Sequence, residues 1–251
     1  MTFLRLTFVL WLFFLFVGPI HGMEENDLEV SLLAPKTPRG KRMSIPPTDL
    51  LALDLSANYN TSSTDRRLDD CERARFRVNG NELYMTGEIG GGIIRRLFRK
   101  LRRNPQVDTL VLERVWGSCN DDIMVRLGRR IHNRGLKTRI PNNGLVASGG
   151  TDLFLAGVER TIGDNACLGI HEWCCYNGKT PAELPSDHPE HDFYIEYYQD
   201  IEYSHPVDFY WLGIHAAPPD GMHWMTLTEL REFDMATHAR YGSGRCQRND
   251  E

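Results

Sequence analysis

The stretch VDTLVLERVWGSCNDDIMVRLGRRIHNRGLKTRI, residues 107–140, decides the fold class. It opens with a short apolar run rich in β-forming residues, which indicates a buried parallel strand. A helix is expected next, over residues 120–134, with Asp121 in its first turn and Gly135 at its end, as the helix dipole and the C-cap favour. A further strand is expected over residues 136–140. Strand, helix and strand in this order predict a βαβ unit with a parallel sheet.

The alternation of strands and helices also precedes this unit. Alternating apolar and polar residues around Asn79 and Gly80 predict a β-hairpin. An apolar stripe over residues 93–101 predicts a helix. The other face of that helix is basic and carries Arg95, Arg96, Arg99, Lys100, Arg102 and Arg103. We interpret this face as solvated, with contact to anionic lipid or nucleic acid as the alternative.

The N-terminal region has the pattern of an export signal. An uncharged apolar run occupies residues 6–20, which is short for a membrane span and typical of a signal peptide. The protein is therefore expected to be exported, periplasmic or secreted; an uncleaved anchor over residues 6–20 is the alternative. The expected organisation is a signal peptide or signal-anchor (1–22), a flexible linker (23–72), a folded domain (73–242) and a C-terminal tail (243–251).

Composition excludes several classes of protein. Hydrophobic residues make up 41% of the chain and charged residues 25%, which is ordinary for a globular protein. The formal net charge of -5 gives no reason to expect a nucleic-acid partner. Neither a GxGxxG turn before a helix nor a P-loop is present, so the sequence predicts no dinucleotide or nucleotide site, and no cofactor.

Six cysteines in an exported chain indicate disulfides, and six allow fifteen full pairings, among which the sequence does not choose. They are Cys71, Cys119, Cys167, Cys174, Cys175 and Cys246. A bridge from Cys119 to one of the next three cysteines is one hypothesis. A zinc site formed by Cys167, His171, Cys174 and Cys175 is another, but this spacing matches no common structural site, so no metal is expected.

Ser148 and His171 are the candidate catalytic residues. Ser148 lies between the apolar residues 145–147 and an expected helix, and Gly149 follows it. Backbone N–H groups at a helix N-terminus favour negative charge, so they could stabilise the oxyanion that develops on a substrate carbonyl attacked by Ser148. His171 lies on a strand-like segment and has a suitable pKa for a general base. The alternatives are an N-capping serine and a structural histidine.

Three segments give the chain a family resemblance. They are VASGGTDLFLAGVERTIGDNACLGIHE (146–172), LVLERVWGS (110–118) and WMTLTELREFDMAT (224–237). The chain resembles the Clp-type serine proteases, the wider Clp/crotonase superfamily and exported bacterial proteins of that fold, over roughly residues 76–239. The resemblance implies an α/β fold, a Clp/crotonase-like spiral of βαβ units with a mainly parallel sheet, after the signal sequence and linker.

The resemblance also implies roles for individual residues. Ser148 would be the nucleophile and His171 the general base. Gly149 and Gly117 would supply the oxyanion-hole N–H groups, and Asp220 would orient the imidazole. Two departures weaken these assignments: the loop reads Val-Trp-Gly where the family has Gly-Gly, and Asp220 lies in Ala-Pro-Pro-Asp-Gly, which favours an exposed turn.

The function expected from this pattern is an exported serine hydrolase, a peptidase in the first instance. The alternative is a catalytically inactive Clp-fold protein used for binding or assembly; acyl-thioester chemistry of the crotonase type fits less well. Asp208 is the fallback for Asp220. Expected partners are a peptide or other acyl substrate and a further copy of the chain, with no nucleic acid and no membrane contact except through an uncleaved N-terminal segment. Aromatic residues over 187–214 predict two helices, packed in the core or lining a substrate groove or subunit contact.

Overall fold

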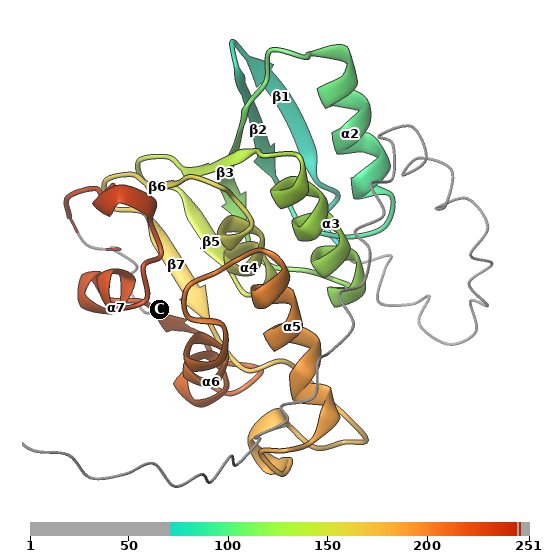
Figure 1. Ribbon diagram of the computed structural model, residues 1–251, viewed down its shortest axis with the longest axis vertical. Helices are drawn as coiled ribbons and strands as arrows, with labels where there is room; N and C mark the ends of the chain where they lie inside the picture. The colour runs from blue at the N-terminus through green and yellow to red at the C-terminus, as the bar shows by residue number, and fades with distance from the viewer. Residues whose placement is uncertain (1–70, 245, 247–251) are drawn as a thin grey trace, which may run out of the picture. The chain divides into compact units, whose positions relative to one another are not determined.

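Eight strands form one largely parallel sheet in the part of the chain that the computed structural model describes, residues 71–244 and 246 (Figure 1). Antiparallel pairing is confined to β1 with β2 and β7 with β8. The strands are β1 (Arg75–Asn79), β2 (Glu82–Thr86), β3 (Thr109–Val115), β4 (Lys137–Ile140), β5 (Leu145–Ala147), β6 (Arg160–Ile162), β7 (Cys167–Ile170) and β8 (His223–Trp224).

The sheet forks at β3. Its first half pairs in parallel with β4, which continues to β6. Its last residues, Arg114 and Val115, pair instead with β5, which continues to β7. Because β3 and β5 run in parallel and side by side at this point, the loop after β3 and the turn after β5 leave the same edge of the sheet. Ligand sites in open α/β sheets lie at such carboxyl ends.

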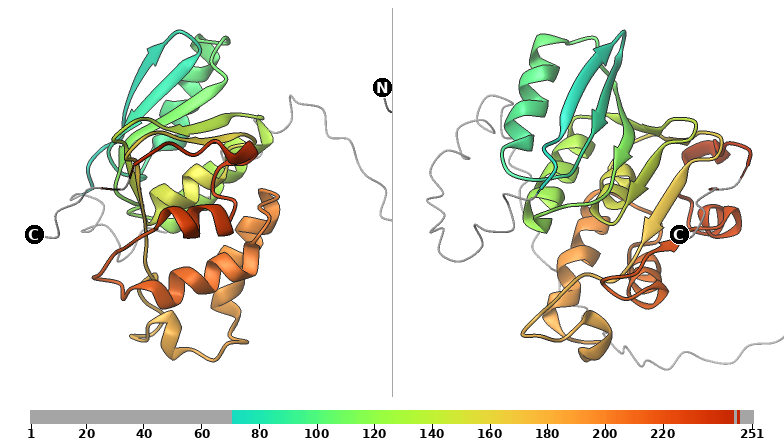
Figure 2. Two further views of the ribbon diagram at one scale, coloured as in Figure 1. Left: turned by 90° about the vertical axis from the view of Figure 1, so that its left-hand side faces the viewer. Right: turned by 180° about the vertical axis from the view of Figure 1, so that it is seen from behind.

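Helices pack against the sheet and against one another (Figure 2). α3 packs on α4 and on α5, and α5 packs on α6. The α-helices are α2 (Ile93–Arg103), α3 (Asp121–Asn133), α4 (Gly149–Leu155), α5 (Asp192–Asp200), α6 (Pro206–Ala216) and α7 (Leu227–Glu232). Three short 3-10 helices are η2 (Pro181–Glu183), η3 (Pro189–His191) and η4 (Thr237–Ala239).

The side-chain alternation of β5 divides the apolar residues between two clusters. Val146 belongs to the large core that the helices share with the sheet. Leu145 and Ala147 belong to a smaller cluster that includes Trp116 and Trp224. Since successive strand residues point to opposite faces, this smaller cluster covers the other face of the sheet.

The structure confirms the main fold predictions. The hairpin, the βαβ unit and the mainly parallel sheet are all present. The aromatic residues over 187–214 lie on two helices, as expected, except Tyr203, which lies between them, and most are buried core residues. The predicted signal and almost all of the linker lie outside the described residues, and within residues 71–244 no helix is long and apolar enough to cross a membrane.

All six cysteines form disulfides, in the pairs Cys71–Cys119, Cys167–Cys246 and Cys174–Cys175. The hypothesis that Cys119 bridges to Cys167, Cys174 or Cys175 is therefore wrong. The zinc hypothesis is wrong for the same reason, since a disulfide sulfur is not a thiolate ligand. Cys119 pairs with Cys71 because two consecutive β-bridges, Arg73 with Glu88 and Ile89 with Ser118, hold the start of the described chain and the loop after β3 against the same segment.

Removal of the Cys71–Cys119 bond should lower the free energy of unfolding by about 2–4 kcal/mol, because the bond restricts the unfolded chain. The two residues are 48 positions apart. Replacing both by Ser, followed by urea unfolding, measures the loss. The matched control is the double Ser variant at Cys174 and Cys175, which are neighbours and close no loop. Equal losses in both variants would contradict the prediction.

Candidate active site

Ser148 lies in a strained turn between β5 and α4. Its backbone has φ 52° and ψ -132°, a left-handed conformation that costs a non-glycine residue about 1–3 kcal/mol. Its N–H donates to Gly169 O at 3.0 Å, and this bond extends the β5–β7 ladder by one residue. The sheet therefore holds Ser148 in a conformation that the residue would not adopt by itself.

The Ser148 hydroxyl does not cap the helix. α4 has no side-chain hydrogen bond at its N-cap. The Ser148 carbonyl instead accepts the N–H groups of Thr151 and Asp152, at 2.8 and 3.2 Å. The capping alternative for Ser148 therefore has no hydrogen bond to support it, and its hydroxyl remains available for chemistry.

Two glycines after Ser148 allow a close approach between α4 and β3. A Cβ atom on Gly150 would lie 2.3 Å from Val115 O, and one on Gly149 would lie 2.5 Å from Ser118 Oγ. Gly117 lies beside the same turn, since a Cβ there would be 3.4 Å from Ser148 Cβ. The structure thus brings the two predicted oxyanion-hole residues, Gly117 and Gly149, next to Ser148.

Ser148 and His171 line one cavity of about 180 Å³. Its polar wall consists of Ser118, Asp121, Ser148, Asp152 and His171 together with Tyr194, Tyr198 and Tyr210. The remaining lining residues include Ile170, Trp173, Cys174, Phe209, Gly213 and Ile214. The cavity lies at the carboxyl ends of β5 and β7, under α5 and α6.

His171 follows the last residue of β7, and its partial burial favours the neutral imidazole. Desolvation lowers the pKa of His171 below its ordinary value of 6.5. The carbonyl of Pro219 and the charges of Asp121 and Glu172 act in the opposite direction. Its Nδ1 atom is buried and has no hydrogen-bond partner among the described residues. A neutral imidazole at physiological pH is the form that a general base requires.

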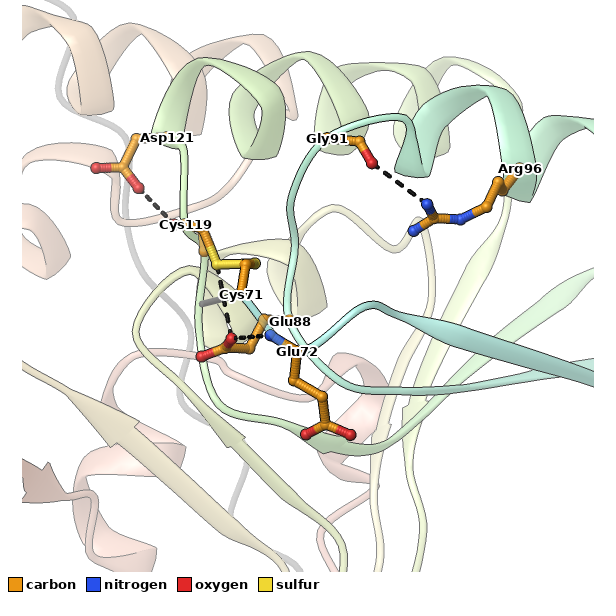
Figure 3. The surroundings of a disulfide bond; sticks show 8 residues. Cys71, Glu72, Glu88, Gly91, Arg96, Cys119 and Asp121 are labelled. Atoms are coloured by element: carbon orange, nitrogen blue, oxygen red, sulfur yellow. Dashed lines mark hydrogen bonds between the residues drawn. A yellow bond between two sulfur atoms is a disulfide. The ribbon is translucent and has the colours of Figure 1, made fainter. Parts of the chain in front are cut away.

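Asp121 is the carboxylate that acts on His171 from within the cavity. It is the first residue of α3 and accepts a hydrogen bond from the Ser118 hydroxyl. The Cys71–Cys119 bond holds the loop that precedes it (Figure 3). Glu88 reinforces the same corner, because its Oε2 accepts the Glu72 N–H at 2.6 Å and lies 3.6 Å from Cys119 Sγ.

Asp152 is the second carboxylate of the cavity, on α4 and four residues after Ser148. Its Oδ1 accepts a hydrogen bond from Tyr198 Oη at 2.6 Å. Burial raises the pKa of Asp152 to about 7; the Tyr198 hydrogen bond opposes the rise, and the Asp121 charge adds to it. Asp152 therefore gains or loses a proton near neutral pH.

The structure does not bring Asp220 or Asp208 into the cavity. Both side chains are exposed, and neither belongs to the lining residues. Asp220 lies in the predicted turn, and from this turn the backbone carbonyls of Pro218 and Pro219, not the Asp220 carboxylate, raise the pKa of His171. The assignment of Asp220 as the third residue thus has no contact to support it. Trp116 does not crowd the site either, since it packs against Trp224 in the smaller cluster.

Sequence reasoning missed Asp121 and Asp152 as site residues. Asp121 was interpreted as a favourable charge in the first turn of a helix, which it also is. The position of Asp152 could have indicated its place in the site, because Asp152 is four residues after Ser148 and residues four apart on a helix share one face. Within the described chain, the cysteines and carboxylates grouped closely enough for a metal ion are Cys71, Glu88 and Cys119, and two of these form a disulfide.

Comparison with known proteins gives structural likenesses only. No protein-family model matches the chain, and no curated protein is significantly similar to it. A mutant of the 1510-N membrane-bound stomatin-specific protease, in complex with a substrate peptide, matches with a TM-score of 0.44 and 16% identity, over 65% of this chain and 74% of that one. A second mutant of that protease matches with a TM-score of 0.45 and 15% identity, over 65% of this chain and 78% of that one.

The catalytic domain of the ClpP protease from Plasmodium falciparum matches with a TM-score of 0.44 and 14% identity, over 68% of this chain and 86% of that one. Solved structures of the Clp-type serine proteases are thus among those that this chain is similar to, each with a TM-score below 0.5. The names of these structures describe the proteolytic activity of the stomatin-specific protease and of the ClpP protease, not that of this chain.

Substitution of Ser148 by Gly should raise the free energy of unfolding by about 1 kcal/mol, because Gly adopts positive φ without strain. Ser148→Ala keeps the strain and should leave stability close to that of the wild type. Urea unfolding of the three proteins measures both changes. A capping serine would give the opposite result, with both variants less stable than the wild type.

Proposed function

We propose that this protein is a serine hydrolase that cleaves an acyl bond, a peptide bond in the first instance, with Ser148 as nucleophile and His171 as general base. One observation carries the proposal: the Ser148 hydroxyl, at a strained turn and without a capping role, lines a cavity together with a histidine that burial keeps neutral. Strain at a turn of this kind is typical of functional sites.

The reaction that these residues support has two halves. Ser148 Oγ attacks the carbonyl carbon while His171 accepts its proton, and the N–H groups of Gly149 and Gly117 stabilise the oxyanion. The imidazolium then protonates the leaving amine, and the C–N bond breaks. Water, deprotonated by His171, releases the acyl group from Ser148. Asp121 stabilises the imidazolium electrostatically, in place of the predicted Asp220.

Export and membrane attachment remain part of the proposal. Three disulfides among the described residues favour an oxidising compartment, either periplasmic or extracellular. We further propose that residues 6–20 direct the chain there, as a cleaved signal or as an anchor.

A non-catalytic binding or assembly role is the second candidate. It is favoured by the unpartnered Nδ1 of His171, because a carboxylate usually fixes this atom in a Ser-His-Asp arrangement. The two candidates differ in whether the serine is activated.

Treatment of the full chain with a fluorophosphonate probe should label Ser148, because the probe requires an activated serine. Ser148→Ala should abolish labelling, and His171→Ala should reduce it by about 10²-fold or more. Mass spectrometry of the labelled peptide identifies the site. If the folded wild-type protein is not labelled, the binding role is the better account.

The labelling rate should rise with pH and level off, with a midpoint below 6.5, because the pKa of His171 is lowered and only the neutral imidazole accepts a proton. Asp121→Asn should move the midpoint to a lower pH, since it removes a charge that raises this pKa. Asp220→Asn should leave the midpoint unchanged. A lower midpoint in Asp220→Asn together with an unchanged midpoint in Asp121→Asn would restore Asp220 as the residue that orients His171.

A further inference from the structure

Two carboxylates line the cavity, and the electrostatic role of Asp121 toward His171 leaves Asp152 without a role in acyl transfer. Asp152 accepts a hydrogen bond from Tyr198, and Asp121 accepts one from Ser118. Both donors are neutral hydroxyls. Among the described residues, no Lys or Arg lines the cavity. His171 does line it, but desolvation lowers its pKa and favours the neutral imidazole.

These two carboxylates are energetically unfavourable beside one another. A buried carboxylate without a cationic partner is unfavourable, and a second carboxylate nearby increases the cost. The groups around Asp152 are Asp121 from α3, Tyr194 and Tyr198 from α5, and His171 after β7. The Tyr197 hydroxyl donates to the Asp152 backbone carbonyl, at 2.8 Å. None of these groups supplies a positive charge at neutral pH.

We propose that the cavity is a specificity pocket for a cationic side chain, an ammonium or guanidinium group on an alkyl stem, and that Asp152 binds its charge while the charge of Asp121 adds to the attraction. The inference rests on the proposed function for the position of the scissile bond, which would lie at Ser148 on the same cavity wall. The substrate class is then a peptide, or another acyl compound, with a basic group next to the bond that is cleaved.

The size and walls of the cavity agree with such a group. Its volume of about 180 Å³ is below the roughly 300–1,000 Å³ typical of pockets for whole small molecules, so it suits a single side chain. Trp173, Phe209 and Ile214 provide apolar surface for the methylene groups. Aromatic rings also attract cations at their faces.

Binding of a cation should be linked to the proton on Asp152. Below pH 7 the Asp152 carboxyl is mainly protonated, and a bound cation stabilises its ionised form. Binding therefore releases a proton in this range, and the affinity rises as the pH is raised through about 7. A neutral ligand of the same shape shows neither effect.

The test uses full-length Ser148→Ala protein, so that no turnover occurs, and isothermal titration with two probes. These are Nα-acetyl-lysine amide and its uncharged isostere Nα-acetyl-2-aminoheptanoic acid amide, in which a methyl group replaces the ammonium group. The lysine probe should bind at least tenfold more tightly at pH 8, and this preference should shrink at pH 6. Adding Asp152→Asn should remove most of the preference, since Asn still accepts the Tyr198 hydrogen bond but carries no charge. Adding Asp187→Asn, at an exposed position, should leave it unchanged.

Equal affinity for the two probes, or a preference that survives Asp152→Asn, would overturn the inference. If the Asp152→Asn protein does not fold, the pH dependence of the preference decides alone. Fluorophosphonate labelling of the wild type separates this inference from the proposed function. If the wild type is labelled but shows no preference for the lysine probe, the hydrolase proposal stands and the inference of a cationic pocket is wrong. If the protein prefers the lysine probe but is not labelled, the pocket is a binding site and the hydrolase proposal is wrong.

Discussion

The hydrogen bond from Ser148 N–H to Gly169 O is the constraint on which the site depends. It continues the parallel pairing of β5 and β7 beyond the last residue of β5, and so fixes the backbone of Ser148 before α4 begins. Thr151 adds a second bond to the same carbonyl through its hydroxyl, at 2.8 Å. With Gly169 held in this way, His171 follows two residues later on the same strand end. One strand pair therefore positions both the proposed nucleophile and the proposed base, and Ser148 adopts a strained φ in this arrangement.

Burial then determines the charges around that pair. The helices that cover the carboxyl ends of β5 and β7 remove water from His171 and Asp152 alike, and desolvation favours the neutral form of each. For His171 the neutral form is the useful base. For Asp152 the same effect leaves a carboxyl that ionises near neutral pH and whose charge lacks a cationic partner. One physical cause thus supports both the proposed nucleophile activation and the proposed preference for a cationic substrate group.

Local patterns were sufficient to predict the fold, but only part of the site. The βαβ unit over residues 107–140 was predictable because hydrophobic periodicity, turn glycines and helix charges all act within a few residues. Local features singled out Ser148 and His171, but their catalytic roles came from the family resemblance and stay a prediction. Asp121 and Asp152 were not predictable, because their proximity to His171 depends on how α3 and α4 pack against α5. The pairing of Cys119 with Cys71 depends on β-bridges between distant segments. Asp220 shows the limit of resemblance, since its own turn sequence already indicated exposure.

The most direct test of the central claim is a crystal structure of the wild-type protein soaked with an aryl boronic acid, which forms a tetrahedral adduct with an activated serine. The account predicts a bond from boron to Ser148 Oγ, a positive φ at Ser148, a boronate oxygen within hydrogen-bond distance of the Gly149 N–H, and His171 within reach of the adduct. A Ser148 with negative φ, its hydroxyl bonded to an N–H of the first turn of α4 and no adduct in the cavity, would contradict it.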